Sequence, residues 1–251
     1  MKTINGRKLT WKKSPKDKRD LLFKAHPKAA GEILQQSDFK YLDSPIEDQG
    51  QTGSCVGNST ASCLEYLQNK HGRTFTDMSR MMLYYQARAE QGWQNTDDGC
   101  YIRDAIKVAN RDGVCHESLW PFDPKLLYTK PTPECFANAQ EHQLVEYYKA
   151  TNLDEVLIAI SAGLPIVFGI QLFPQFMEVG KDGMVKKPGC FDRSIGGHAM
   201  KISGHMMKYE LLIVKNSWGR GWGDNGYCYI PFKYFSRRAD DIWVLISGEE
   251  M

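Results

Sequence analysis

The sequence predicts an α+β protein in which a lobe of helices is followed by a lobe of strands. Between residues 50 and 125, apolar side chains recur at three- and four-residue steps, which is typical of amphipathic helices. After residue 163 the chain contains short runs rich in β-branched and aromatic residues, with turn residues between them. Helices and strands that are segregated along the chain imply packed layers, and the junction of two such lobes commonly holds a cleft.

The order of these segments gives the expected elements. The first helix opens directly after Ser54, and the last helix follows Asn152, a residue type that is favoured as a helix cap. A proline-rich stretch over residues 121–133 predicts the crossing between the two lobes. We expect helices over residues 55–69, 78–91, 101–111 and 153–162. We expect strands over residues 165–172, 198–205, 209–217, 227–231 and 242–247.

Composition excludes several classes of function. The 251 residues include 32 lysines and arginines against 30 acidic residues, so a net charge of +2 gives no reason to expect a nucleic acid as partner. No apolar run approaches the ~20 residues that cross a bilayer, so we expect no membrane association. The N-terminus is not a secretory signal as written, which favours a cytoplasmic location. The seven cysteines form no cluster with zinc-ligand spacing, so no metal site is expected.

The first 20 residues are strongly basic, with eight lysines and arginines against two aspartates. Blocks of like charge are usually solvated, so a flexible arm is the favoured interpretation of this stretch. The alternative is that the arm contacts a partner or the protein's own cleft. We expect residues 1–40 to form this basic arm or a short pro-segment, ahead of a domain over residues 41–251.

Cys55 is the first candidate for catalysis. It begins the first predicted helix after a loop with two glycines, DQGQTGSC, where unpaired N–H groups stabilise a thiolate. The pKa of such a thiol is expected in the ~3.5–7.5 window of activated cysteines. Gln49 lies on the same loop, and its side-chain amide could form an oxyanion hole together with the backbone N–H of Cys55. The alternative for a lone cysteine is a buried structural residue.

A base and an orienting residue follow in the strand half. His198 opens a predicted strand in the segment GGHAM, where Gly197 allows another backbone to approach closely. Asn216, in KNSWG, can accept a hydrogen bond from the ring of His198 and hold its orientation. Trp218 could then cover that hydrogen bond and exclude water. A cysteine, a histidine and an asparagine in this chain order indicate nucleophilic catalysis.

Three segments, DQGQTGSC, GGHAM and VKNSWGRGWGDNGYCYI, together resemble the active-site segments of the papain family of cysteine peptidases. His198 follows Cys55 by about 140 residues, within the ~130–150 that the family shows. The resemblance covers roughly residues 40–251, and the segment 101–122 looks like bacterial and viral members. It implies a two-lobed fold, with a helical lobe at about 50–125, an antiparallel, barrel-like β lobe at about 130–251, and the active site between them.

The resemblance also implies a role for individual residues. Cys55 looks like the nucleophile, His198 the base, Asn216 the orienting residue and Gln49 the oxyanion-hole donor. It implies a cysteine endopeptidase that hydrolyses peptide or protein substrates through a thioester, without a cofactor. Thr52 stands where many members have a disulfide-forming cysteine, which agrees with a reducing compartment. The expected substrate-binding residues are Gly99, Cys100, Gly197 and Trp218.

Two alternatives to the peptidase remain open. An acyltransferase or amidase could use the same triad with a different acceptor, although nothing in the sequence marks an amine-binding site. A non-catalytic binding module of the same fold is the second alternative, although such proteins usually lose the cysteine or the histidine. Because only about 40 residues precede the domain, the basic arm itself is a candidate for a short inhibitory plug.

Overall fold

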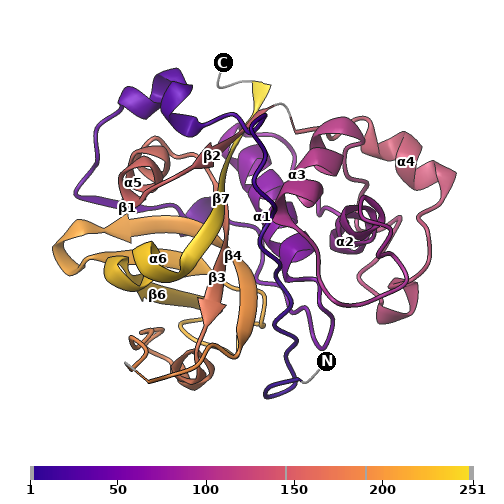
Figure 1. The fold of residues 1–251 in the computed structure, drawn as a ribbon. Coiled ribbons are helices and arrows are strands. Elements are labelled where there is room, and N and C mark those ends of the chain that lie inside the picture. The colour runs from indigo at the N-terminus through magenta and orange to yellow at the C-terminus, as the bar shows by residue number, and fades with distance from the viewer. Residues whose placement is uncertain (1–2, 145, 190, 249–251) are drawn as a thin grey trace.

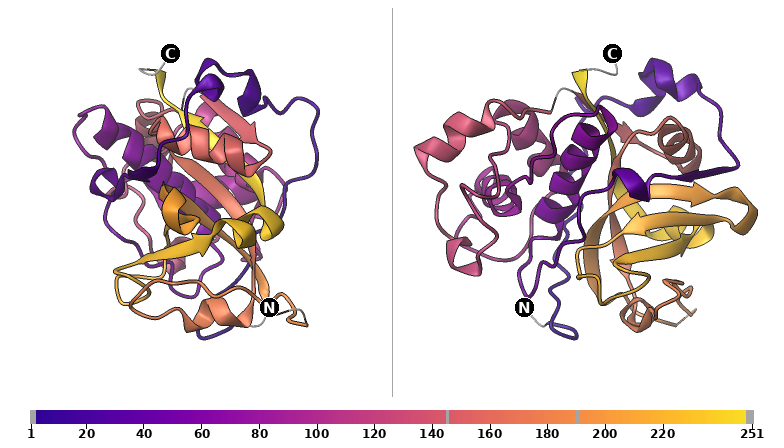
Figure 2. Two further views of the ribbon diagram at one scale, coloured as in Figure 1. Left: turned by 90° about the vertical axis from the view of Figure 1, so that its left-hand side faces the viewer. Right: turned by 180° about the vertical axis from the view of Figure 1, so that it is seen from behind.

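The computed structural model describes residues 3–144, 146–189 and 191–248. A group of helices lies on one side of the molecule and a twisted antiparallel sheet on the other, as Figures 1 and 2 show. Helix α1 (Cys55–Lys70) lies between them and packs against α2 and α3 on one side and against β4 on the other. The α+β architecture with two lobes that the sequence predicts is therefore the observed one.

The expected helices are present, with small shifts at their ends. Ser79 caps α2 by accepting a hydrogen bond from Met82 N at 3.1 Å. Asn152 caps α5, as predicted, by accepting one from Glu155 N at 2.9 Å. The α-helices are α1 (Cys55–Lys70), α2 (Arg80–Ala89), α3 (Ile102–Arg111), α4 (Pro133–Ala139), α5 (Leu153–Ser161) and α6 (Phe232–Arg238). Short 3-10 helices cover Phe23–Ala25, Pro27–Ala30, Lys40–Leu42, Pro124–Leu126, Pro174–Glu178 and Met207–Tyr209.

The strands form an antiparallel sheet in the order β2-β7-β3-β4-β5-β6, and β1 also pairs with β4. The strands are β1 (Gln36–Asp38), β2 (Glu146–Ala150), β3 (Ile166–Leu172), β4 (Gly196–Met206), β5 (Leu211–Lys215), β6 (Tyr227–Pro231) and β7 (Ala239–Ile246). Long β4 is central, and its register sets Ile170 of β3 opposite His198. The end of β4 that carries His198 faces α1 because the two elements pack together.

Each lobe has its own apolar core. One cluster joins α1, α2 and α3 and reaches the sheet through Val167, Ala199 and Trp243. The other cluster lies among β3, β4, β5, β7, α5 and α6. Two separate cores joined along α1 make the junction of the lobes the natural place for a cleft.

Two α-helices and two strands were not predicted. The prolines near residue 131 do not only break the chain: Thr132 caps α4, and Pro133 occupies its first turn, where a missing N–H costs nothing. Helix α6 connects β6 to β7 with only seven residues, too few for a clear apolar period. Strand β1 has only three residues, and β2 lies at the edge of the sheet. Neither sequence alternates strictly between apolar and polar residues.

Candidate active site

Cys55 is the first residue of α1, as the sequence predicts, and its side chain is fully buried. The loop before it is held by Asp97, whose carboxylate accepts hydrogen bonds from Gly53 N at 2.9 Å and from the Tyr84 hydroxyl at 2.8 Å. These bonds fix the approach of the chain to the helix. Tyr84 lies on α2 and Asp97 on the segment between α2 and α3, and sequence reasoning did not identify them.

His198 and Asn216 are hydrogen-bonded across neighbouring strands. His198 lies on β4, and Asn216 directly follows β5, which pairs with β4. The distance from His198 Nε2 to Asn216 Oδ1 is 2.7 Å, and both side chains are buried. His198 Nδ1 has no hydrogen-bond partner in the structure. Because Nε2 is held by Asn216, Nδ1 is the ring atom that remains for proton exchange.

Cys55 and His198 belong to the same small region. The backbone of Ala199, the residue after His198, is close enough to the Cys55 thiol to lower its pKa. The N-terminus of α1 therefore lies against the start of β4, and Figure 1 shows these two elements in contact. The fold thus brings the predicted nucleophile next to the strand that carries the predicted base.

Trp218 covers the bond between His198 and Asn216. Its ring centroid lies 4.9 Å from that of His198, and only 3% of Trp218 is exposed. Phe176 and Trp222 hold it from the other side, with ring centroids at 5.4 and 5.2 Å. This aromatic cluster excludes water from the hydrogen bond, which strengthens it. Phe176 was not identified from the sequence.

Gln49 is anchored through Ser217. The Ser217 hydroxyl is 2.8 Å from Gln49 Oε1, and Gln49 Nε2 donates to Thr52 O at 3.0 Å. Ser217 N also donates to Asn216 Oδ1 at 2.8 Å. Ser217 therefore links the predicted oxyanion-hole residue to the predicted orienting residue. Its position between Asn216 and Trp218 was the available signal, but a serine there has no distinctive pattern.

The N-terminal arm, defined here as residues 7–14, lies in the cleft between the lobes. In Figure 1 it is the indigo segment that runs between the sheet and the helices. Trp11 N donates to Gly197 O at 3.0 Å, and Lys12 N donates to Cys100 O at 3.4 Å. Both pairings are parallel, so the arm is extended between the two walls. The favoured interpretation of a flexible, solvated arm is therefore wrong for these residues.

The arm contacts each predicted substrate-binding residue. Besides Cys100 and Gly197, it touches Trp218, whose carbonyl accepts from Arg7 Nη2 at 3.0 Å. Gly99 has φ +78°, and a Cβ there would lie 1.9 Å from the carbonyl oxygen of Thr10. Only glycine fits both conditions. All four residues therefore lie beside the arm, and their role in binding substrate stays a prediction.

The covered site is electrically neutral rather than activated. Burial raises the pKa of Cys55 to about 11, although hydrogen bonds from Ala199, Val56 and Thr10 act in the opposite direction. Burial also lowers the pKa of His198 to about 4, the bond from Asn216 opposes this, and the charge of Arg7 adds to the lowering. The lowered thiol pKa expected from the helix N-terminus is thus wrong for this arm-covered form, because desolvation outweighs the helix.

This neutrality gives a pH prediction. Between pH 6 and 8 the buried thiol of the full-length chain stays protonated, so its alkylation by iodoacetamide should be slow and rise only toward pH 11. A chain without residues 1–13 should react near pH 6, because its thiol regains water and the imidazole. Mass spectrometry of the Cys55 peptide measures both rates. Equal rates at pH 6 would contradict the prediction.

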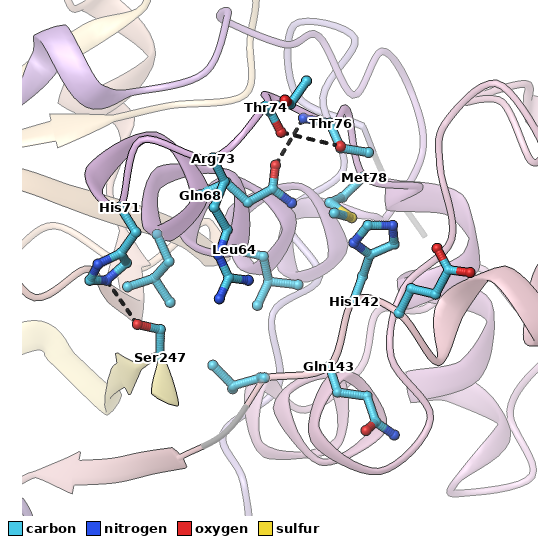
Figure 3. Close-up of a pocket in the computed structure, with 13 residues that line it drawn as sticks. Leu64, Gln68, His71, Arg73, Thr74, Thr76, Met78, His142, Gln143 and Ser247 are labelled. Atoms are coloured by element: carbon cyan, nitrogen blue, oxygen red, sulfur yellow. Dashed lines mark hydrogen bonds between the residues drawn. The ribbon is translucent and has the colours of Figure 1, made fainter. Parts of the chain in front are cut away.

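A cavity of about 190 Å³ lies away from these residues (Figure 3). It is bounded by the C-terminal part of α1 and by residues 141–144, and His71 Nε2 on its wall is 2.8 Å from the Ser247 hydroxyl. It contains none of the predicted site residues. Within the described part of the chain, no three His, Cys, Asp or Glu side chains gather so that they could hold a metal ion. Among the described residues, no helix combines the length and apolar character needed to cross a bilayer.

Comparison with known proteins identifies the family. The sequence model of the papain family of cysteine proteases matches residues 35–236 of this chain. An uncharacterized peptidase C1-like protein of Acanthamoeba polyphaga mimivirus is 36% identical over 212 residues, which are 79% of this chain and 68% of that protein. Papain of Carica papaya is 25% identical over 212 residues, which are 79% of this chain and 57% of the papain sequence.

A solved structure agrees along nearly the whole chain. The crystal structure of xylellain, a cysteine protease from Xylella fastidiosa, matches with a TM-score of 0.86 and 27% identity. The match covers 98% of this chain and 99% of that one. The two-lobed papain-like fold predicted from the sequence is thereby confirmed. The chain belongs to the papain family of cysteine proteases.

Proposed function

We propose that the chain is a cysteine endopeptidase that cleaves peptide or protein substrates with Cys55, His198 and Asn216. The observation that carries the proposal is the buried bond from His198 Nε2 to Asn216 Oδ1, which leaves Nδ1 unpaired beside the strand segment that touches the Cys55 thiol. A histidine held in this way by an amide oxygen has the tautomer and orientation that nucleophilic catalysis needs.

The reaction follows from these groups. Once the arm is out of the cleft, His198 Nδ1 takes the proton of Cys55, and the thiolate attacks the substrate carbonyl. The imidazolium then returns the proton to the leaving amine, and a thioester remains on Cys55. Water, activated by His198, hydrolyses the thioester and releases the second product. No cofactor enters these steps.

Gln49 and the backbone N–H of Cys55 are proposed to hold the oxyanion of both tetrahedral intermediates. Ser217 fixes the amide of Gln49, and only one of its two Nε2 hydrogens is used by Thr52. Replacing Gln49 by alanine should lower kcat by about 10²–10³-fold, because one oxyanion donor is lost. Steady-state kinetics of Gln49→Ala and of the exposed neighbour Gln51→Ala measure this. A Gln49→Ala variant that stays within threefold of Gln51→Ala would contradict the role.

We also propose that residues 1–40 are a short pro-segment ahead of a peptidase domain over residues 41–251. The arm supports this because it fills the groove between the lobes and buries the thiol. The cytoplasmic location and the absence of nucleic-acid and membrane partners stay predictions from the sequence.

The main alternative is an acyltransferase or amidase with the same triad. Labelling with a thiol-reactive peptide epoxide tests the nucleophile, and product analysis on a peptide with added free amine tests the acceptor. We expect an adduct on Cys55 and hydrolysed products. Products joined to the amine would favour the transferase, and the absence of any adduct would favour a non-catalytic binding module.

A further inference from the structure

The two carboxylate oxygens of Asp97 bind different parts of the protein. Its Oδ1 accepts from Gly53 N and from the Tyr84 hydroxyl, which holds the loop before Cys55. Its Oδ2 pairs with Lys8 Nζ at 2.5 Å. The side chain of Asp97 is only 5% exposed, whereas that of Lys8 is 25% exposed. Among the described residues, Lys8 of the arm is the ion-pair partner of this second oxygen.

The arm carries further basic side chains, and two of them form ion pairs with acidic residues outside the arm. Arg7 forms an ion pair with Asp48, and Lys13 forms one with Asp240. The acids of these two pairs are far more exposed than Asp97, at 51% for Asp48 and 39% for Asp240, so solvent screens both pairs and they contribute little. The surroundings of the arm are therefore complementary to a basic segment, and Asp97 is the most buried of the three acids that form ion pairs with it.

Asp97 lies close to the predicted point of cleavage. Gly53, which it holds, is two residues before Cys55, and the Gly53 carbonyl accepts from the Thr10 hydroxyl at 2.9 Å. Thr10 is also close enough to the Cys55 thiol to lower its pKa. Lys8, which pairs with Asp97, is therefore only two residues before Thr10, the arm residue beside the nucleophile. A bound peptide with a basic side chain near the scissile bond can make the same pair.

When the arm leaves the cleft, a buried carboxylate oxygen loses its partner, which is unfavourable unless another cation replaces it. We propose that Asp97 is the specificity-determining residue of the cleft and selects peptides with a lysine or arginine next to the cleaved bond. This inference rests on the proposed peptidase function. It names the class of substrate: basic peptides that resemble the arm in charge.

The test uses the full-length chain with Lys8→Met, which frees Asp97 from the arm without removing any residue. Two peptide epoxides that differ only by lysine or norleucine at the residue nearest the epoxide are compared by their rate of Cys55 labelling. Because labelling is irreversible, it accumulates even if the arm opens rarely. We expect the lysine probe to react about 10–100-fold faster, since a buried charged pair discriminates strongly against a neutral isostere.

Asp97→Asn in the same background separates specificity from structure. Asparagine keeps the Oδ1 acceptor for Gly53 and Tyr84 and replaces the charged Oδ2 by a neutral NH2 group. The preference for lysine should fall to about threefold or less, because the lysine probe loses its charged partner. Asp98→Asn, the adjacent acid, is the matched control and should keep the preference.

The outcomes are distinguishable. Equal labelling by both probes in Lys8→Met would overturn the proposal and leave the peptidase intact. A loss in Asp97→Asn that is the same for both probes would make Asp97 structural and also overturn it. No labelling of Cys55 by either probe would overturn the peptidase itself, and this inference with it.

Discussion

Replacing Cys55 by alanine should lower peptide hydrolysis by at least about 10⁴-fold, the largest effect we expect from any single substitution. The thioester cannot form without the sulfur, and the remaining groups can only bind the substrate and polarise its carbonyl. Because the side chain is small and buried at the start of α1, alanine should leave the fold intact. kcat/KM on a quenched fluorescent peptide under reducing conditions measures the loss.

Cys63→Ala is the matched control, since Cys63 is equally buried and lies two turns further along the same helix. It should retain activity within a few-fold. A Cys55→Ala variant that keeps more than one tenth of the activity would contradict the assignment of the nucleophile.

Removing residues 1–13 should raise activity by on the order of 10²-fold. A tethered segment that keeps the cleft closed in about 99% of molecules gives this gain when it is removed. The deletion ends before Ser14 because the Ser14 hydroxyl holds Asp241 at 2.6 Å. Asp20, which pairs with Arg103, also remains. Steady-state hydrolysis of one peptide by the two chains, at equal concentration, measures the gain.

Two controls separate release from damage. Thermal unfolding of the chain without residues 1–13 must remain cooperative. Full-length Lys18→Ala should not be activated, because Lys18 is an exposed basic residue outside the arm. Full-length Arg7→Ala should be activated to a smaller extent, because Arg7 pairs with Asp48 and bonds to Trp218 O. A well-folded deletion with no gain in activity would show that the arm is not a plug.

The features of the fold and site that could be predicted are those with a local sequence pattern. Cys55 at a helix start and the pair of His198 and Asn216 on neighbouring strands follow from short motifs whose local structure is strongly constrained. The structure places these residues as the motifs suggest, with a 2.7 Å bond between His198 and Asn216. The apolar periods of α1 and α3 were also sufficient, because long amphipathic helices carry a clear signal.

The rest depends on contacts between distant segments. Asp97 and Ser217 are ordinary polar residues whose roles arise only when the loop before α1 packs against them. The lowered thiol pKa that the helix N-terminus predicts does not hold in this form, because burial raises the pKa of Cys55. Both are consequences of packing, which no spacing in the sequence expresses.

One signal for the arm was present in the sequence. Gly169 lies inside the otherwise β-branched and aromatic run of β3, and a glycine in a strand often marks the close approach of another group. In the structure, a Cβ at Gly169 would lie 1.9 Å from the indole of Trp11. The sequence could not show that Trp11 is the approaching residue, because it is about 160 residues away from Gly169 in the chain.

The most direct test of the account is to trap the acyl-enzyme. The chain without residues 1–13 and the full-length chain are each mixed with a peptide ester, quenched in acid, and digested for mass spectrometry. We predict an adduct with the mass of the acyl group on the peptide that contains Cys55, abundant in the shortened chain and scarce in the full-length one. Turnover without that adduct, or an adduct on another residue, would contradict thioester catalysis by Cys55.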